Sequence, residues 1–255
     1  MKIKIGSFNA WNCSITRKDS LFLSRVFAGV VKRESFDVVG IQELTLNYCN
    51  NLKNNLVNYS FLGSYRFGNS ILKGLPFNEN NNIITDKKVL FQKTYLMPFL
   101  PVNCKELKQS INIKRWSLLP RVATVAVLEF FNKSICIINT HLDYKINSIK
   151  KRQLDFLIKL VSDYAHSYPV VLMGDFNLGI NDDIFNNFVF ELNGLGIKRV
   201  LINDNTWNCR GQNKKTLDHV FVPGDWDVLN YGVIDDCDMD SISDHRMIFT
   251  ECEIK

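Results

Sequence analysis

Four short apolar runs of the sequence end in side chains that can bind a cation or move a proton. These ends carry Asn9, Glu43, His141 and the pair Asp175 and Asn177. Carboxylate and amide oxygens are hard ligands that suit Mg²⁺ or Mn²⁺ better than zinc. A carboxylate can also take a proton from water, and an imidazole can donate or accept one. The pattern therefore favours an enzyme that uses a divalent cation and acid–base groups.

Two later apolar runs have the opposite polarity, because their polar residues come first. Asp218 precedes the run 219–222, and Asp244-His245 precedes the run 247–254. In antiparallel strands, the start of one strand lies beside the end of its neighbour. A single Asp, Glu or His at a strand end is usually a turn or capping residue, but all these groups together predict one site at one sheet edge.

The elements that must position these groups make this an α/β (α+β) chain. Helical periodicity is seen at Leu23–Val31, with Asp19 or Ser20 as the cap, and at Leu154–Ala165, with Ser148 as the cap. The runs 122–130 and 135–139 are joined by a short link and predict a hairpin, so a purely parallel sheet is excluded. The predicted strands are 3–8, 38–41, 122–130, 135–139, 170–173, 219–222 and 247–254.

Composition sets broader limits. With 255 residues, 46% of them hydrophobic, the chain can form one large core, and we expect a single catalytic domain over residues 1–255. No signal peptide or membrane-spanning run is evident, so a cytoplasmic protein without stable membrane insertion is expected. The seven cysteines are scattered singly, which excludes a zinc site built on close pairs. A net charge of +5 suits an anionic ligand but is too small to name one.

The motifs, taken in order, resemble those of the endonuclease/exonuclease/phosphatase superfamily, which includes DNase I. That resemblance implies a four-layer αββα sandwich, with two mixed β-sheets packed face to face and helices outside. It also implies a metal-dependent hydrolase of phosphate esters, with Mg²⁺, or Mn²⁺ in its place, at the sheet edge. The motifs are Ser7-Phe8-Asn9-Ala10-Trp11, Ile41-Gln42-Glu43, Gly68-Asn69-Ser70-Ile71-Leu72, Asn139-Thr140-His141-Leu142-Asp143, Gly174-Asp175-Phe176-Asn177, Leu217-Asp218-His219-Val220-Phe221-Val222 and Ser243-Asp244-His245.

The resemblance also implies a role for each matching residue. The metal would be held mainly by Glu43, with Asn9 and Asp244 as further metal-site residues. Asp175 with Asn177 would activate water, and His141 and His245 would contact the phosphoryl oxygens. Asp218 would hydrogen-bond His245 and favour its protonated form. Arg121 and Asn69 would bind the substrate phosphate, although Lys114 and Arg115 compete with Arg121 for that position.

Other conspicuous residues have structural explanations. We expect His166 and His219 to be surface or packing residues. The segment Lys150-Lys151-Arg152 is expected to be the solvated start of a helix, or else to line the path of a polyanion. The aromatic residues Phe185, Phe188, Phe190, Trp207 and Trp226 are expected to pack in the core or in loops rather than to stack on bases.

Among substrates, the sequence favours nucleic acid and a DNase I-like endonuclease. The segment Thr140-His141-Leu142-Asp143 lacks the Tyr-and-Asn loop of abasic-site endonucleases, and Leu217-Asp218-His219 departs from the inositol phosphatase signature. The alternative is a phosphatase or phospholipase C-type enzyme acting on inositol phosphates, phosphoinositides or sphingomyelin. A third hypothesis is an inactive binding module, which is disfavoured because no central residue is missing. No protein partner is predicted, and the loops at 77–116 and 178–208 are expected to flank the site.

Overall fold

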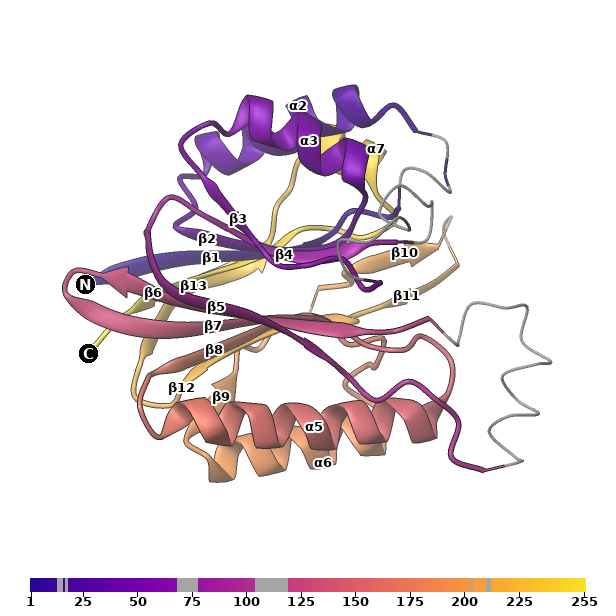
Figure 1. The fold of residues 1–255 in the computed structure, drawn as a ribbon, viewed down its shortest axis with the longest axis vertical. Coiled ribbons are helices and arrows are strands. Elements are labelled where there is room, and N and C mark those ends of the chain that lie inside the picture. Colours follow the sequence, from indigo (N-terminus) through magenta and orange to yellow (C-terminus); the bar gives the residue numbers. More distant parts are fainter. Residues whose placement is uncertain (13–15, 17, 68–77, 104–118, 203, 210–211) are drawn as a thin grey trace.

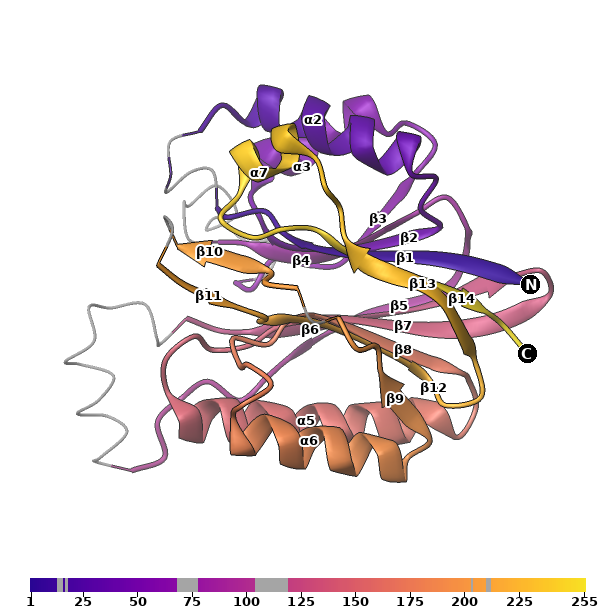
Figure 2. The same ribbon diagram turned by 180° about the vertical axis from the view of Figure 1, so that it is seen from behind.

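Two six-stranded β-sheets lie face to face, with helices on both outer surfaces (Figures 1 and 2). The structure is a computed structural model, and it describes residues 1–12, 16, 18–67, 78–103, 119–202, 204–209 and 212–255. The expected four-layer sandwich of mixed sheets is confirmed.

The first sheet has the strand order β13-β14-β1-β2-β4-β3. Its strands β1 and β2 are parallel, and the other pairs are antiparallel. The strand bounds are β1 Lys2–Asn9, β2 Val38–Leu44, β3 Ser60–Leu62, β4 Asn80–Thr85, β13 Asp227–Val233 and β14 Ile248–Glu253.

The second sheet has the order β5-β6-β7-β8-β12-β9. Here β7 and β8 are parallel, and the predicted hairpin is the antiparallel pair β6 and β7. Its strands are β5 Lys88–Leu96, β6 Val122–Phe130, β7 Lys133–His141, β8 Val170–Asp175, β9 Ile197–Arg199 and β12 Asp218–Pro223. A separate two-stranded sheet joins β10 (Trp207–Cys209) to β11 (Gln212–Lys215).

Three apolar clusters hold the layers together. One lies between the sheets, where Ile5 and Val38 meet Val171 and Val220. Another joins the first sheet to α2, α3 and α7, and the third joins the second sheet to α5 and α6. The helix bounds are α2 Ser20–Arg33, α3 Leu46–Asn55, α5 Asn147–Ala165, α6 Asp183–Gly194 and α7 Cys237–Ile242.

The two predicted helix caps have different outcomes. Asp19 is the N-cap of α2, and its side chain accepts a hydrogen bond from the backbone N–H of Leu21. The prediction of Ser148 as the cap of α5 is wrong, because the helix begins at Asn147. Instead, the carboxylate of Asp143 accepts from the N–H groups of Lys145 and Ile146 just before the helix. An acidic side chain there also complements the positive end of the helix dipole.

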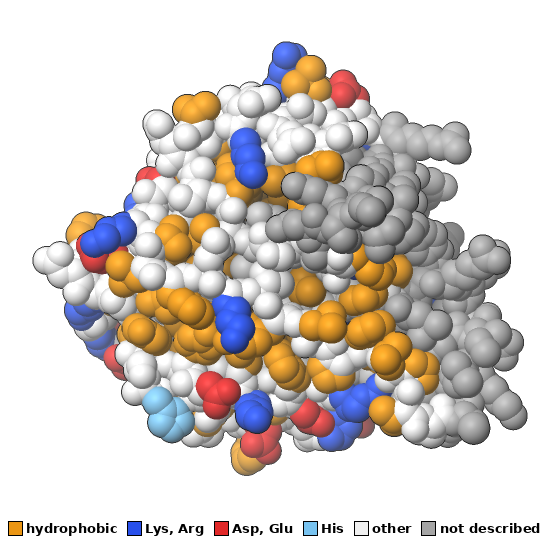
Figure 3. Space-filling model, viewed as in Figure 1, with side chains coloured by type: hydrophobic (Ala, Val, Ile, Leu, Met, Phe, Trp, Pro, Cys, Tyr) orange, Lys and Arg blue, Asp and Glu red, His pale blue; other side chains and the backbone are white. Residues whose placement is uncertain are grey.

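Strand β5 is an edge of the second sheet and carries exposed apolar side chains. Leu90, Phe91 and Leu96 are 45%, 43% and 56% exposed. Figure 3 shows hydrophobic side chains in a band across this face of the molecule. No helix among the described residues is long and apolar enough to cross a membrane.

Candidate active site

The polar strand ends meet around one cavity of about 870 Å³ at the edge shared by the two sheets. Asn9, Glu43, His141 and Asp175 end or nearly end β1, β2, β7 and β8. Both chain termini lie at the opposite edge (Figure 1). The lining comprises Asn9, Trp11, Glu43, Arg66, Glu79, Leu119, Arg121, His141, Tyr144, Lys150, Asp175, Asn177, Gly179, Ile180, Asn181, Asp182, Asn205, Trp207, Lys215, Thr216, Leu217, Asp244 and His245.

Asp175 is buried and lines this cavity. Its Oδ1 accepts from the backbone N–H of Asn177 at 2.9 Å, and its Oδ2 accepts from Asn9 Nδ2 at 2.8 Å. The backbone of Asn177 adopts a left-handed conformation, with φ of 50°. Burial raises the pKa of Asp175 to about 6, although the charge of His245 opposes the shift. A carboxylate with such a pKa is suited to accept a proton near neutral pH.

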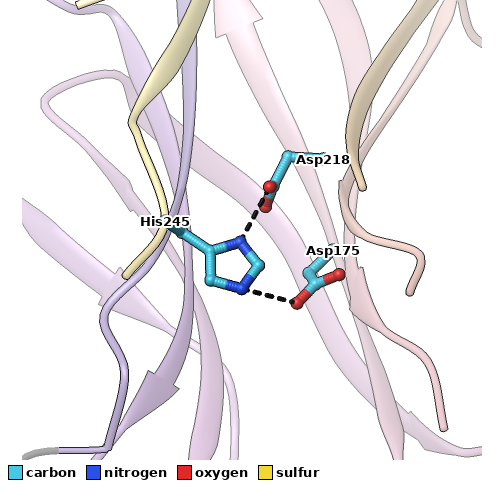
Figure 4. A group of neighbouring side chains, drawn as sticks. All are labelled: Asp175, Asp218 and His245. Carbon is cyan, nitrogen blue, oxygen red and sulfur yellow. Dashed lines mark hydrogen bonds and ion pairs between the residues drawn. The ribbon is translucent and has the colours of Figure 1, made fainter. Parts of the chain in front are cut away.

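His245 lies between two carboxylates (Figure 4). Its Nδ1 is 2.8 Å from Asp218 Oδ2, and its Nε2 is 3.7 Å from Asp175 Oδ2. Burial alone would lower the pKa of His245, but the charges of Asp218 and Asp175 raise it to about 10. The imidazole is therefore positively charged at neutral pH and can donate from Nε2.

His141 is neutral, in contrast to the protonated His245. Burial lowers its pKa well below the usual range, and the charges of Arg121 and Arg66 lower it further. Arg121 Nη1 lies 3.1 Å from His141 Nδ1, and because a guanidinium can only donate, Nδ1 must be the acceptor. The proton of the neutral ring is then on Nε2, which lies 3.6 Å from Asp175 Oδ2. Thus both histidines present an Nε2–H group beside Asp175.

Glu43 faces the cavity from an irregular part of β2. A register shift between Ile41 and Leu44 and a φ of 56° at Glu43 turn its carboxylate out of the sheet. Its Oε2 accepts from the N–H of Asn12, and its Oε1 accepts from Asn9 Nδ2 at 3.3 Å. The amide oxygen of Asn9 accepts from the N–H of Trp11. Through its amide nitrogen, Asn9 orients both carboxylates, and its role as a metal-site residue stays a prediction.

The donor set at Glu43 and Asp244 fits a hard divalent cation. Both carboxylates line the cavity. Burial raises the pKa of Asp244, the charge of His245 opposes this, and the charge of Glu43 raises the pKa further. Two like charges facing one cavity repel each other unless a cation lies between them. Oxygen ligands of this kind match the preference of Mg²⁺ and Mn²⁺.

A second group of candidate ligands is Asp175, Asp218 and His245, whose donor atoms lie within 4.8 Å of one another. In this group, His245 Nδ1 and Asp218 Oδ2 are already hydrogen-bonded to each other. While that bond is kept, His245 can offer only Nε2 to a cation. A cation held by Glu43 and Asp244 would leave the hydrogen-bond chain through His245 unchanged.

Three residues have contacts at the cavity that the sequence analysis did not assign to them. Arg66 is buried and forms an ion pair with Glu79, close to Arg121. Lys150 is also buried, and its Nζ donates to the carbonyl oxygen of Asn177 at 2.9 Å, so the expectation of a solvated residue is wrong. Trp207 is half-buried and lines the cavity, where its indole N–H donates to Asp244 Oδ2.

The remaining predicted residues lie as follows. Arg121 is beside His141, as described above, whereas Asn69, Lys114 and Arg115 fall outside the described residues. The loops expected to flank the site do so in part, through Glu79 and the segment 179–182.

Three other expectations concern packing. His219 is buried, contacts the rings of Phe176 and Phe185, and has Nε2 3.0 Å from the carbonyl oxygen of Leu178. His166 is exposed at the end of α5. Phe190 is 75% exposed and so does not pack in the core.

Comparisons with known proteins identify the family and the fold of the chain. The sequence model of the protein family described as Endonuclease/Exonuclease/phosphatase family matches residues 6–245. An endonuclease/exonuclease/phosphatase from Bacteroides vulgatus has a TM-score of 0.80 at 20% identity, with 100% of each chain covered. A mannosyl-6-phosphatase from Bacteroides thetaiotaomicron has a TM-score of 0.77 at 20% identity, covering 99% of this chain and 100% of its own.

A third similar structure is D. rerio TDP2 complexed with single strand DNA product. It has a TM-score of 0.73 at 18% identity, with 99% of each chain covered. At these identities, the structural likeness bears on the fold. No curated protein sequence matches the chain.

Proposed function

The chain belongs to the endonuclease/exonuclease/phosphatase family, and on that premise we propose that it is a divalent-metal-dependent phosphodiesterase acting on nucleic acid. One observation carries the proposal. Asp175 Oδ2 lies 3.6 Å from His141 Nε2 and 3.7 Å from His245 Nε2, so a proton acceptor and two donors share one point in the cavity. Phosphoryl transfer needs little more from a protein than positioning and charge stabilisation.

The residues have complementary roles in the proposed hydrolysis. Asp175 orients a water molecule and accepts its proton as the water oxygen attacks phosphorus, and Asn177 holds Asp175 through its backbone N–H. The Nε2–H groups of His141 and His245 donate to the non-bridging oxygens, where negative charge builds up. The ester P–O bond then breaks, the departing oxygen takes up a proton from solvent water, and Asp175 gives its proton back to solvent.

Glu43 and Asp244 would hold Mg²⁺, with Mn²⁺ as a substitute. When bound, the cation stabilises negative charge on the phosphoryl group. Asn9 keeps Glu43 and Asp175 in place by donating one amide hydrogen to each carboxylate. The hydrogen bond from Asn12 N–H restrains the other oxygen of Glu43.

Charge and size support a nucleic-acid substrate. The chain has a net charge of +5, and Arg66 and Arg121 place two cations beside His141. The cavity of about 870 Å³ has room for a nucleotide on each side of the scissile ester. The TDP2 structure with single strand DNA product offers an analogy for this choice.

A phosphatase of small phosphate esters is the second candidate. The buried guanidinium groups of Arg66 and Arg121 favour this candidate. A terminal phosphate carries two negative charges near neutral pH, and two guanidinium groups can pair with both. The mannosyl-6-phosphatase from Bacteroides thetaiotaomicron offers the corresponding analogy.

Supercoiled plasmid separates these candidates. We expect nicked circles in the presence of Mg²⁺ or Mn²⁺, and no nicking with EDTA or with the variant His245→Ala. The variant His166→Ala is a matched control, because His166 is exposed and remote from the cavity, and it should nick normally. Intact plasmid together with hydrolysis of sugar phosphates, inositol phosphates or sphingomyelin would reject the nuclease and support the alternative.

A further inference from the structure

The start of β10 lies directly against the segment that carries Asp244 and His245. Trp207 and His245 form an antiparallel bridge, and the N–H of Arg246 donates to the carbonyl oxygen of Thr206 at 2.7 Å. The pair Thr206-Trp207 therefore runs side by side with Asp244-His245. Neither Thr206 nor Trp207 has a part in the hydrolysis described above.

Thr206 fixes the orientation of the Asp218 carboxylate. It is fully buried, and its Oγ1 accepts from the N–H groups of Leu217 at 3.0 Å and Asp218 at 3.1 Å. With both lone pairs in use, its hydroxyl proton must be donated, and Asp218 Oδ2 lies 2.6 Å away. That same oxygen accepts from His245 Nδ1 at 2.8 Å.

The other oxygen of Asp218 does not hold the carboxylate in place. Asp218 Oδ1 is buried and has no hydrogen-bond partner in the described part of the chain. Without the Thr206 hydroxyl, the carboxylate could rotate about its side chain and turn Oδ2 away from His245. The Thr206 hydroxyl thus holds Oδ2 of Asp218 in position to accept from the imidazole of His245.

Trp207 contacts Asp244, the residue that precedes His245. Its indole N–H donates to Asp244 Oδ2 at 3.2 Å, and its side chain lines the cavity. The indole nitrogen is a donor only, so this contact restrains the Asp244 carboxylate at Oδ2. Residues that hold a metal-binding carboxylate in this way generally affect metal affinity strongly.

We propose that Thr206 and Trp207 form a two-residue positioning element whose side chains serve separate halves of the site. Thr206 orients Asp218 and through it His245, whereas Trp207 orients Asp244 toward the cation. The inference rests on the proposed function for its activity readout. Its structural half, the contact between Thr206 and Asp218, can be tested without any substrate.

The test for Thr206 compares Thr206→Val, which keeps the shape and loses the hydroxyl, with Thr206→Ser, which keeps it. We expect kcat to fall about 10- to 100-fold in Thr206→Val, with KM and the Mn²⁺ dissociation constant within about twofold of wild type. Thr206→Ser should restore kcat. If Thr206→Val does not fold, Thr206→Ala takes its place with the same expected result.

Proton NMR gives a readout independent of turnover. In the wild type, the Nδ1 proton of His245 should appear as a protected, far-downfield resonance because it is held by Asp218. It should broaden or shift in Thr206→Val and persist in Thr206→Ser. An unchanged resonance in Thr206→Val would overturn the role of Thr206, even if no phosphate ester is ever hydrolysed.

The test for Trp207 is a Mn²⁺ titration in which binding is monitored by electron paramagnetic resonance. Trp207→Phe should raise the dissociation constant about 10-fold or more, whereas the matched control Trp226→Phe, in the core between the sheets, should not change it. Unchanged affinity in Trp207→Phe would refute the proposal. So would an equal loss of Mn²⁺ affinity in Thr206→Val, because the two side chains would then not act separately. A wild type that binds no Mn²⁺ and cleaves no ester refutes the proposed function instead.

Discussion

Gly174 permits the close approach of β7 and β8 that brings His141 beside Asp175. These strands are parallel, with Thr140 opposite Gly174 and His141 opposite Asp175. The backbone at Gly174 has φ of 146°, which side chains disfavour. A Cβ added there would lie 2.8 Å from the carbonyl carbon of Thr140 and closer still to its oxygen.

The substitution Gly174→Ala must therefore move backbone. Carbon atoms in normal contact are about 3.5–4.0 Å apart, so β7 and β8 must separate by on the order of 1 Å. A misplacement of that size in a catalytic site can cost about 100-fold in rate, or about 2.7 kcal/mol of transition-state stabilisation. Overpacking of this kind also costs about 1–3 kcal/mol of folding free energy.

The assay pairs metal-dependent ester hydrolysis with urea unfolding. The matched control is Gly194→Ala, since an added Cβ at the end of α6 meets no atom within 4 Å. This control should keep full activity and equal or greater stability. Activity of Gly174→Ala within about twofold of wild type would refute the reasoning, because the contact between β7 and β8 would then not position His141 and Asp175.

Three further predictions concern charge, pH and metal. Asp218→Asn keeps the shape but removes the charge that favours protonated His245, so kcat should fall about 100-fold or more with unchanged circular dichroism. Burial holds the pKa of His219 near 4, below about 6.5 in the unfolded chain, so the unfolded state takes up the proton first as the pH falls. Between pH 6.5 and 4, the free energy of unfolding should therefore fall by at most about 1.4 kcal/mol per pH unit. In urea titrations, the free energy of unfolding of His219→Gln should fall less steeply with pH, and an equally steep fall would count against this role of His219. Mg²⁺ at about 100 times its dissociation constant should stabilise the folded chain by about 2.7 kcal/mol and so raise its melting temperature. EDTA should abolish this increase. A melting temperature insensitive to Mg²⁺ would argue against the metal site.

The sequence predicted which polar residues come together at one cavity, because apolar runs mark where buried strands end. A strand such as β8 is buried on both faces, so its apolar run is unbroken, and the polar residue that follows marks the sheet edge. The hairpin of β6 and β7 was predictable for the same reason. The reversed positions of Asp218 and His245 follow from the antiparallel strands that they begin or precede.

Elements without a strong apolar period were missed. α3 has few apolar residues and several asparagines, so its periodicity is weak, although Tyr48 and Leu52 pack against the first sheet. β5 is a partly exposed edge strand, so its pattern mixes charged and apolar residues. Propensity cannot identify such elements, because tertiary contacts decide their structure.

The contacts of several cavity residues outside the strand ends could not be predicted from the sequence. Lys150 reads as one of three successive basic residues, and only the packing of α5 against β8 turns it inward. Trp207 and Arg66 reach the cavity from segments whose position depends on long-range pairing. No local pattern distinguishes them from loop residues.

The central claim is that Glu43 and Asp244 hold a divalent cation beside Asp175 and the two histidines. It is tested most directly by titrating Mn²⁺ into wild type and Glu43→Gln while following both bound metal and hydrolysis of bis(p-nitrophenyl) phosphate, with exposed Glu253→Gln as the control. The account predicts one saturation curve for binding and activity in wild type and in the control, and loss of both in Glu43→Gln. Full Mn²⁺ binding and activity in folded Glu43→Gln would contradict it.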